Sequence, residues 1–294
     1  MTAIALLGTG LLGRAVAERL HDAGHTVIAF NRTATKALPL QRHGIAVVNT
    51  ADLALSQTDC ALLFLTDAAA IRSTLLTPAS SAALNDKTIV QMGTIGPQES
   101  LEIQHEIERC GGAYCEAPVL GSLAEAKAGT LFVMVGGTQQ QFAAWSPLFR
   151  SLSREPRYIG PVGRASALKL ALNQLIAAET SAFALSLGLV QRSGVSVDTF
   201  MAILRESALF APTFEKKLPR LLKRDYHHPN FSTRHLLKDL MLFIHEAAAR
   251  GMTTEGLKGL PMLLERAIAN GWGDLDYSSL FEVVNPPDSG SQHS

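Results

Sequence analysis

A glycine-rich turn near the start of the chain constrains its fold more than any other feature. The apolar run of residues 4–7 leads into Gly8-Thr9-Gly10-Leu11-Leu12-Gly13, and a helix-like stretch follows over residues 14–23. The first glycine permits a tight turn, the second lets the backbone approach a pyrophosphate, and the third lets the helix pack on the strand. The N–H groups and dipole at the helix N-terminus favour a phosphate. This order therefore predicts a dinucleotide-binding βαβ unit.

The residues after the second expected strand, 26–30, bear on which dinucleotide binds. An NAD site usually places Asp or Glu here to bind the ribose hydroxyls. This chain has Asn31-Arg32-Thr33, with Lys36 one turn further on. An arginine binds phosphate through its fork of donors, and no carboxylate would repel a 2′-phosphate. These residues predict NADP(H) preferred over NAD(H), and a solvated turn with a surface Arg32 is the alternative.

The composition is that of a soluble, two-domain protein. The chain has 294 residues, of which 47% are hydrophobic and 18% charged, and its 26 basic residues balance 26 acidic ones. No nucleic-acid partner is expected from this balance, and no uncharged apolar run reaches the roughly 18 residues of a membrane span. No signal peptide is expected, because the first expected strand begins at residue 4. Three unclustered cysteines and nine scattered histidines predict buried thiols, no metal and a cytoplasmic location.

Short apolar strands alternate with amphipathic helices over residues 1–162. The expected strands are 4–7, 26–30, 46–48, 60–65, 88–91, 113–116 and 131–136. This alternation predicts an α/β fold, a Rossmann-type doubly wound sheet that is largely parallel, with ligands at the carboxyl ends of its strands. We therefore expect Leu65, Thr66 and Thr94 at the cofactor, and residues 117–122 nearby.

An all-helical domain is expected over residues 163–284. Residues 165–192 are predicted to form one long helix, which would span roughly 40 Å. It is apolar nearly all round, so we expect it to be buried between domains or subunits, in at least a homodimer. Further helices are expected at 197–207, 213–223, 232–250 and 259–270. The polar tail, residues 285–294, is predicted to be disordered.

The long helix offers a proton donor for carbonyl reduction. Hydride transfer to a carbonyl needs an acid for the developing alkoxide and a group that holds the substrate's anionic end. Lys169 lies in an almost wholly apolar stretch, where lost solvation makes its ammonium group a better acid. Asn173 follows one turn later on the same face. The alternative is a lysine that extends to solvent beside an unrelated asparagine.

Four segments in this order make the chain resemble the β-hydroxyacid dehydrogenase family over nearly its whole length. They are the glycine turn with Gly24-His25-Thr26-Val27, then Glu116-Ala117-Pro118-Val119-Leu120-Gly121-Ser122 continuing through residue 137, the block 163–173, and Lys238-Asp239-Leu240. The resemblance implies an NAD(P)-dependent oxidoreductase of small hydroxy acids or aldehyde acids.

The resemblance also implies roles for matching residues. Lys169 corresponds to the catalytic lysine, Asn173 to the asparagine beside it, and Gly121 and Ser122 to the loop that binds the substrate carboxylate. The other matches are Thr94 near the nicotinamide and substrate, Lys238 at the cofactor, and Phe231 and Asp239 on the substrate side. Three alternatives stay open: Ser122 capping a helix, Phe231 in the core, and Asp239 paired with a surface lysine.

One departure from the family pattern concerns the substrate. Many members have Ser-Gly-Gly after Pro-Val, where this chain has Leu120-Gly121-Ser122. Reductases of glyoxylate and succinic semialdehyde commonly carry the later serine, which favours NADPH-dependent reduction of such aldehyde acids, although Leu120 makes the pocket more apolar. The alternatives are oxidation of a β-hydroxy acid such as 3-hydroxyisobutyrate, and imine reductase-like activity or a non-catalytic scaffold. The retained Lys169 disfavours the last two.

Overall fold

The computed structural model describes residues 2–287. The chain divides into two compact units, residues 1–170, which we call the sheet unit, and residues 171–294, which we call the helical unit. The division falls inside the long helix α9 (Arg164–Arg192).

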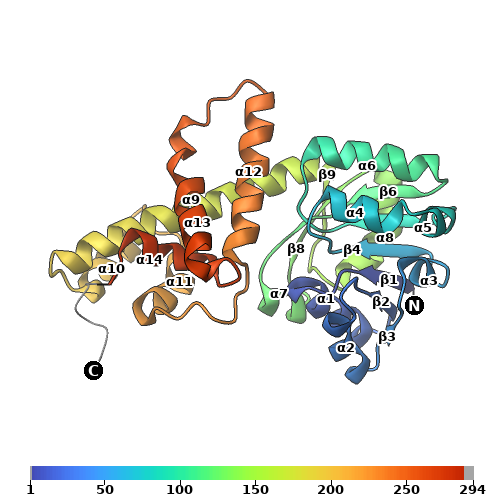
Figure 1. The fold of residues 1–294 in the computed structure, drawn as a ribbon, viewed down its shortest axis with the longest axis horizontal. Coiled ribbons are helices and arrows are strands. Elements are labelled where there is room, and N and C mark those ends of the chain that lie inside the picture. Colours follow the sequence, from blue (N-terminus) through green and yellow to red (C-terminus); the bar gives the residue numbers. More distant parts are fainter. Residues whose placement is uncertain (1, 288–294) are drawn as a thin grey trace. The chain divides into compact units, whose positions relative to one another are not determined.

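The sheet unit contains a mainly parallel sheet of nine strands (Figure 1). They are β1 (Ala3–Leu7), β2 (Thr26–Phe30), β3 (Ala46–Val47), β4 (Cys60–Leu63), β5 (Thr88–Gln91), β6 (Ala113–Glu116), β7 (Val119–Leu120), β8 (Phe132–Gly136) and β9 (Arg157–Gly160). Their order is β3-β2-β1-β4-β5-β6-β8-β7, with β9 paired to β8. The chain order reverses between β1 and β4, which is where such sheets bind ligands.

The predicted α/β fold with a largely parallel sheet is confirmed, with differences at its edges. Strands β1 to β6 pair in parallel, whereas β8 runs antiparallel to β6 and β7. We did not predict β7, which has two residues, or β9, whose first residue is the polar Arg157. The strand expected at 60–65 ends at Leu63, and the carbonyl group of Phe64 packs against Gly8 of the glycine turn.

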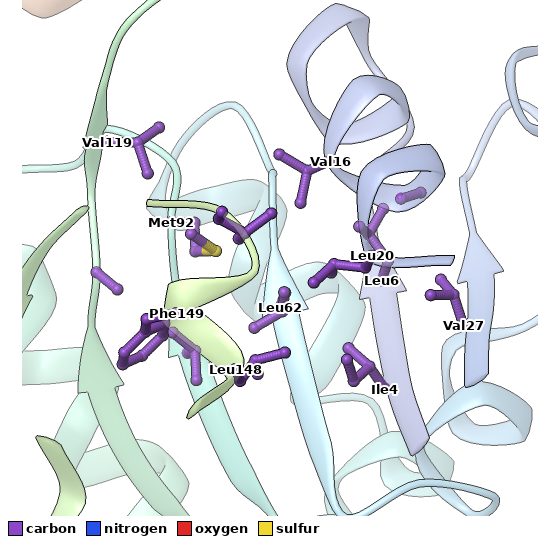
Figure 2. Packing of buried hydrophobic residues seen from close by; sticks show 14 of the residues in the cluster. Ile4, Leu6, Val16, Leu20, Val27, Leu62, Met92, Val119, Leu148 and Phe149 are labelled. Atoms are coloured by element: carbon purple, nitrogen blue, oxygen red, sulfur yellow. The ribbon is translucent and has the colours of Figure 1, made fainter. Parts of the chain in front are cut away.

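Both faces of the sheet are covered by helices. These are α1 (Leu11–Asp22), α2 (Ala34–Arg42), α3 (Ala51–Leu55), α4 (Ala68–Leu75), α5 (Pro78–Ala82), α6 (Pro97–Arg109), α7 (Leu123–Ala128) and α8 (Gln139–Arg150). Alternate residues of β1 enter opposite cores, since side chains alternate along a strand. Ile4 and Leu6 pack with α1 and α8, as Figure 2 shows, while Ala5 and Leu7 join the core with α3, α4 and α6.

The helical unit is built from α10 (Val197–Glu206), α11 (Pro212–Lys223), α12 (Thr233–Ala249), α13 (Gly259–Ala267), α14 (Leu280–Val284) and most of α9, with short turns η1 (Glu255–Leu257), η2 (Ile268–Trp272) and η3 (Tyr277–Ser279). The rings of Phe183 and Phe214 stack with centroids 4.6 Å apart, and Leu240 and Phe281 are buried beside them. The predicted helical C-terminal domain is confirmed. The helix expected at 259–270 gives way to a π turn at Ile268.

Helix α9 is only partly buried within one chain, and its expected burial between domains or subunits stays a prediction. Ala184 and Leu187 are fully buried in the helical core, whereas Leu185 and Leu189 are 56% and 69% exposed. Among the described residues, α9 is the one helix whose length and composition alone would suit a membrane span. The core helix of a helical domain has the same composition, and the burial of Leu187 shows that α9 serves as one.

Asn285 differs from the expected disorder of the tail. Its side chain is buried, accepts a hydrogen bond from Arg192 (2.6 Å) and donates one to Gln191 (3.0 Å). The predicted disorder of residues 288–294 concerns a segment outside the described residues.

Candidate functional site

The glycine turn has the close packing that its sequence predicts. Gly8 has φ +101°, and a Cβ there would fall 2.4 Å from the carbonyl oxygen of Phe64. A Cβ on Gly13 would fall 2.1 Å from the carbonyl oxygen of Gly8. No atom lies within 4 Å of where a Cβ on Gly10 would stand. Two glycines are therefore required by packing, while Gly10 leaves the turn open on one side.

The start of α1 fits a pyrophosphate group. Gly10 is its N-cap and supplies no side-chain cap, and the first helical bond runs from the Arg14 N–H to the Gly10 carbonyl (2.9 Å). The N–H groups of residues 11–13 therefore lack helical partners. The buried Thr9 hydroxyl also has no partner in the described part of the chain. These donors lie where β1 meets β4, and they match the needs of a dinucleotide phosphate.

The residues at the end of β2 differ in their contacts, although all of them were assigned to cofactor binding from the sequence. Asn31 Oδ1 accepts the Thr9 N–H (2.9 Å), and its Nδ2 donates to the Thr33 carbonyl (2.9 Å). Asn31 therefore holds the glycine turn in place. Arg32 and Lys36 are exposed and carry the positive charge at this strand end.

Two further loops reach the same edge of the sheet. Leu65 and Thr66 follow β4, and Leu65 lies 3.2 Å from a Cβ placed on Gly8. Thr94 follows β5 by three residues, after Gly93, whose Cβ would meet the Leu65 carbonyl oxygen at 2.6 Å. The structure thus places Leu65 against the glycine turn and Gly93 against Leu65, with Thr66 and Thr94 next to them in sequence.

The Gly121-Ser122 loop follows β7, in which the half-buried Leu120 pairs with Phe132 of β8. Ser122 starts α7, as the capping alternative required. The carboxylate of Glu125 accepts the Ser122 N–H (2.8 Å) and also its hydroxyl. Both Ser122 donors therefore face a carboxylate of the chain itself. We had not considered Glu125, although Ser-x-x-Glu is a known helix-start pattern.

Lys169 lies in the first turns of α9, in the sheet unit, and is partly buried. The start of this helix is held by Glu116, at the end of β6, whose carboxylate accepts the N–H groups of Gly163 and Ala165, each at 2.8 Å. Glu116 belongs to the motif that we quoted for the family resemblance, but nothing in the local sequence revealed this contact.

The helical unit brings three of the expected residues together. Asn173 Nδ2 donates to Asp239 Oδ2 (2.6 Å), and the Lys238 ammonium lies 2.8 Å from Asp239 Oδ1. A carboxylate only accepts, so the amide nitrogen must face Asp239, and the buried Asn173 Oδ1 has no partner among the described residues. Phe231 packs on Tyr277, with ring centroids 5.9 Å apart, and so contributes to the core.

Cys60 and Cys115 are buried as expected, whereas Cys110 is only partly buried, and no metal cluster occurs in the described residues. Within residues 2–287, no three His, Cys, Asp or Glu side chains are grouped to hold a metal ion. Burial raises the pKa of Cys115 to about 12 and that of Cys60 well above its ordinary value. Neither thiol is therefore a nucleophile near neutral pH.

Family models match both parts of the chain. The NAD-binding domain of 6-phosphogluconate dehydrogenase matches residues 3–160, and the NAD-binding domain of NADP-dependent 3-hydroxyisobutyrate dehydrogenase matches residues 163–284.

Individual relatives cover nearly the whole chain. Arabidopsis thaliana glyoxylate/succinic semialdehyde reductase 1 is 29% identical over 283 residues, covering 96% of this chain and 98% of the relative. A probable mitochondrial 3-hydroxyisobutyrate dehydrogenase-like 1 from the same plant is 31% identical over 288 residues, covering 95% and 84%. The solved Mycobacterium tuberculosis 3-hydroxyisobutyrate dehydrogenase with L-serine is 26% identical, covers 97% and 99%, and superposes with a TM-score of 0.86.

Proposed function

Because this chain belongs to the β-hydroxyacid dehydrogenase family of NAD(P)-dependent oxidoreductases, we propose that it reduces small aldehyde acids with NADPH. The substrates proposed are of the glyoxylate and succinic semialdehyde type, and the products are hydroxy acids. One observation carries the proposal: Lys169 lies in the same unit as the open glycine turn. The proton donor and the nucleotide-binding edge are therefore parts of one compact structure.

The residues divide the reaction between them. The cofactor, when bound, supplies the hydride that reaches the carbonyl carbon. The N–H groups at the start of α1 bind its pyrophosphate, and Thr66 and Thr94 line the same edge. Lys169 gives a proton from Nζ to the carbonyl oxygen as negative charge develops there. The backbone at Gly121 and the Ser122 hydroxyl bind the substrate carboxylate, which must displace Glu125 from Ser122.

Initial rates of NADPH and NADH oxidation test the proposal. The panel is glyoxylate, succinic semialdehyde, tartronate semialdehyde, methylglyoxal and a cyclic imine. We expect the carboxylated aldehydes to be reduced fastest, with NADPH. Activity confined to methylglyoxal or to the imine would refute the substrate class, because neither offers a carboxylate to Ser122.

Oxidation of a β-hydroxy acid is the second candidate. The 31% identical relative named as 3-hydroxyisobutyrate dehydrogenase-like favours it. The same residues serve this direction, with Lys169 accepting the hydroxyl proton. This candidate would be supported if kcat/KM for the oxidation of 3-hydroxyisobutyrate with NADP⁺ exceeds kcat/KM for the reduction of every aldehyde acid with NADPH.

Replacing Arg32 with alanine should raise the Kd of NADPH about 10- to 100-fold, because a charge-assisted hydrogen bond to the 2′-phosphate contributes about that much to affinity. The Kd of NADH should hardly change, because NADH has no 2′-phosphate. Fluorescence titration of each cofactor measures both constants. Arg42→Ala is the matched control, since Arg42 is an exposed arginine at the end of α2. Equal weakening of both cofactors would refute the NADP(H) preference.

We also propose a cytoplasmic homodimer or larger homo-oligomer. Leu185 and Leu189, one turn apart on α9, and Ile203 of α10 are each more than half exposed, and exposed apolar surface of this kind supports an interface. Leu189→Glu should lower the mass measured by light scattering to that of one chain, about 31.5 kDa. Leu53→Glu, at an exposed leucine of the sheet unit, should leave the mass unchanged. An oligomer that survives Leu189→Glu would place the interface elsewhere.

A further inference from the structure

The carboxylate of Glu116 is fully buried and accepts five hydrogen bonds. Oε1 accepts the N–H groups of Gly163 (2.8 Å), Ala165 (2.8 Å) and Ser166 (3.1 Å). Oε2 accepts the hydroxyls of Ser166 (2.5 Å) and Ser100 (2.6 Å). All five partners donate, so the site is built for a carboxylate anion.

Four of these five bonds hold the start of α9: three come from Ala165 and Ser166 in its first turn, and one from Gly163 directly before it. The N–H groups at a helix start have no helical partners, and an anion there also interacts favourably with the helix dipole. Glu116 ends β6, so the bonds join the sheet directly to a helix of 29 residues. The fifth bond comes from Ser100 of α6 and is made outside α9.

The space around the Glu116 carboxylate is tightly packed. A Cβ on Gly136 of β8 would fall 2.4 Å from Oε1, so only glycine fits beside the carboxylate. The Ser100 hydroxyl is in turn 2.8 Å from the hydroxyl of the buried Tyr114. The carboxylate is therefore a rigid point between the sheet and α9.

Lys169 follows Ser166 by three residues, less than one helical turn. We propose that Glu116 is a positioning residue for Lys169. By holding the start of α9, Glu116 fixes where the Lys169 side chain lies relative to the edge of the sheet. This inference rests on the proposed role of Lys169 as proton donor. Glu116 does not touch substrate or cofactor in this proposal and acts through the helix.

A double-mutant cycle tests the inference. Glu116→Ala leaves the N–H groups of Gly163, Ala165 and Ser166 without their acceptor, so we expect the start of α9 to shift. Because misplacing a catalytic group by about 1 Å can lower a rate about 100-fold, we expect kcat to fall about 30-fold. In a Lys169→Ala background the same change should lower kcat by less than about threefold, because residues that act as a unit are non-additive. The Kd of NADPH should stay unchanged.

Ser166→Ala and Ser100→Ala form a matched pair for the case in which Glu116→Ala fails to fold. Each removes one hydroxyl bond to Oε2, but only Ser166 belongs to α9. We expect Ser166→Ala to lower kcat about fivefold in the wild-type background only, and Ser100→Ala to leave it within about twofold. Equal losses in the two serine variants, or a Glu116 effect of the same size in both backgrounds, would overturn the inference. A wild-type rate for Lys169→Ala alone would instead refute the proposed function.

Discussion

Replacing Lys169 with alanine should lower kcat for aldehyde-acid reduction about 10²- to 10⁴-fold, the usual contribution of a positioned general acid. The alkoxide that forms on hydride transfer would then take its proton from water. The Kd of NADPH should change little, because the glycine turn and the start of α1 bind the cofactor without the lysine. Steady-state rates at saturating NADPH, together with fluorescence titration of the cofactor, measure both quantities.

Arg164→Ala is the matched control for Lys169→Ala. Arg164 is the exposed first residue of the same helix, so its replacement removes an equal charge from α9. A general effect of charge or helix stability would lower kcat in both variants alike. A Lys169→Ala enzyme within about threefold of wild type would exclude the lysine from proton transfer.

The sheet unit could be predicted closely because its signals are local. The glycine turn marks the joint between β1 and α1, and the alternation of apolar strands with helices indicates the parallel sheet. The two-residue β7 was missed because it is too short to show a periodicity. The buried Asn285 was missed because a polar segment with prolines carries no sign of the contacts with Gln191 and Arg192 that hold it.

For the candidate site, the sequence proposes residues but does not predict their contacts. Lys169 and Asn173 were proposed from their spacing in an apolar helix, and Ser122 from the family resemblance. Neither source identifies the partners that these side chains have here. The Ser122-x-x-Glu125 pattern is typical of a helix start and indicates that the Glu125 carboxylate can contact Ser122. The bond from Gly163 to Glu116 spans 47 residues, and only the fold brings the two together.

Gly13→Ala should weaken the fold and cofactor binding together. Its Cβ would stand 2.1 Å from the carbonyl oxygen of Gly8 and 3.0 Å from Cβ of Phe64. The first neighbour is backbone, so no flexible side chain can give way, and α1 must move off β1. Overpacking of this kind typically lowers stability by about 1–3 kcal/mol. We expect a Tm lower by several degrees and, because the N–H groups of α1 are displaced, a Kd for NADPH at least about tenfold higher.

Gly10→Ala separates these two effects. Gly10 has φ −65°, which alanine adopts readily, and its added Cβ would meet no atom within 4 Å. The Tm should therefore stay at the wild-type value, while the methyl group fills the space that the pyrophosphate approaches and raises the Kd of NADPH. Differential scanning fluorimetry and fluorescence titration distinguish the two variants. A Gly10→Ala protein that binds NADPH with wild-type affinity would mean that the phosphates bind away from the turn. The added methyl group can be accommodated without loss of affinity only if no phosphate occupies the space beside Gly10.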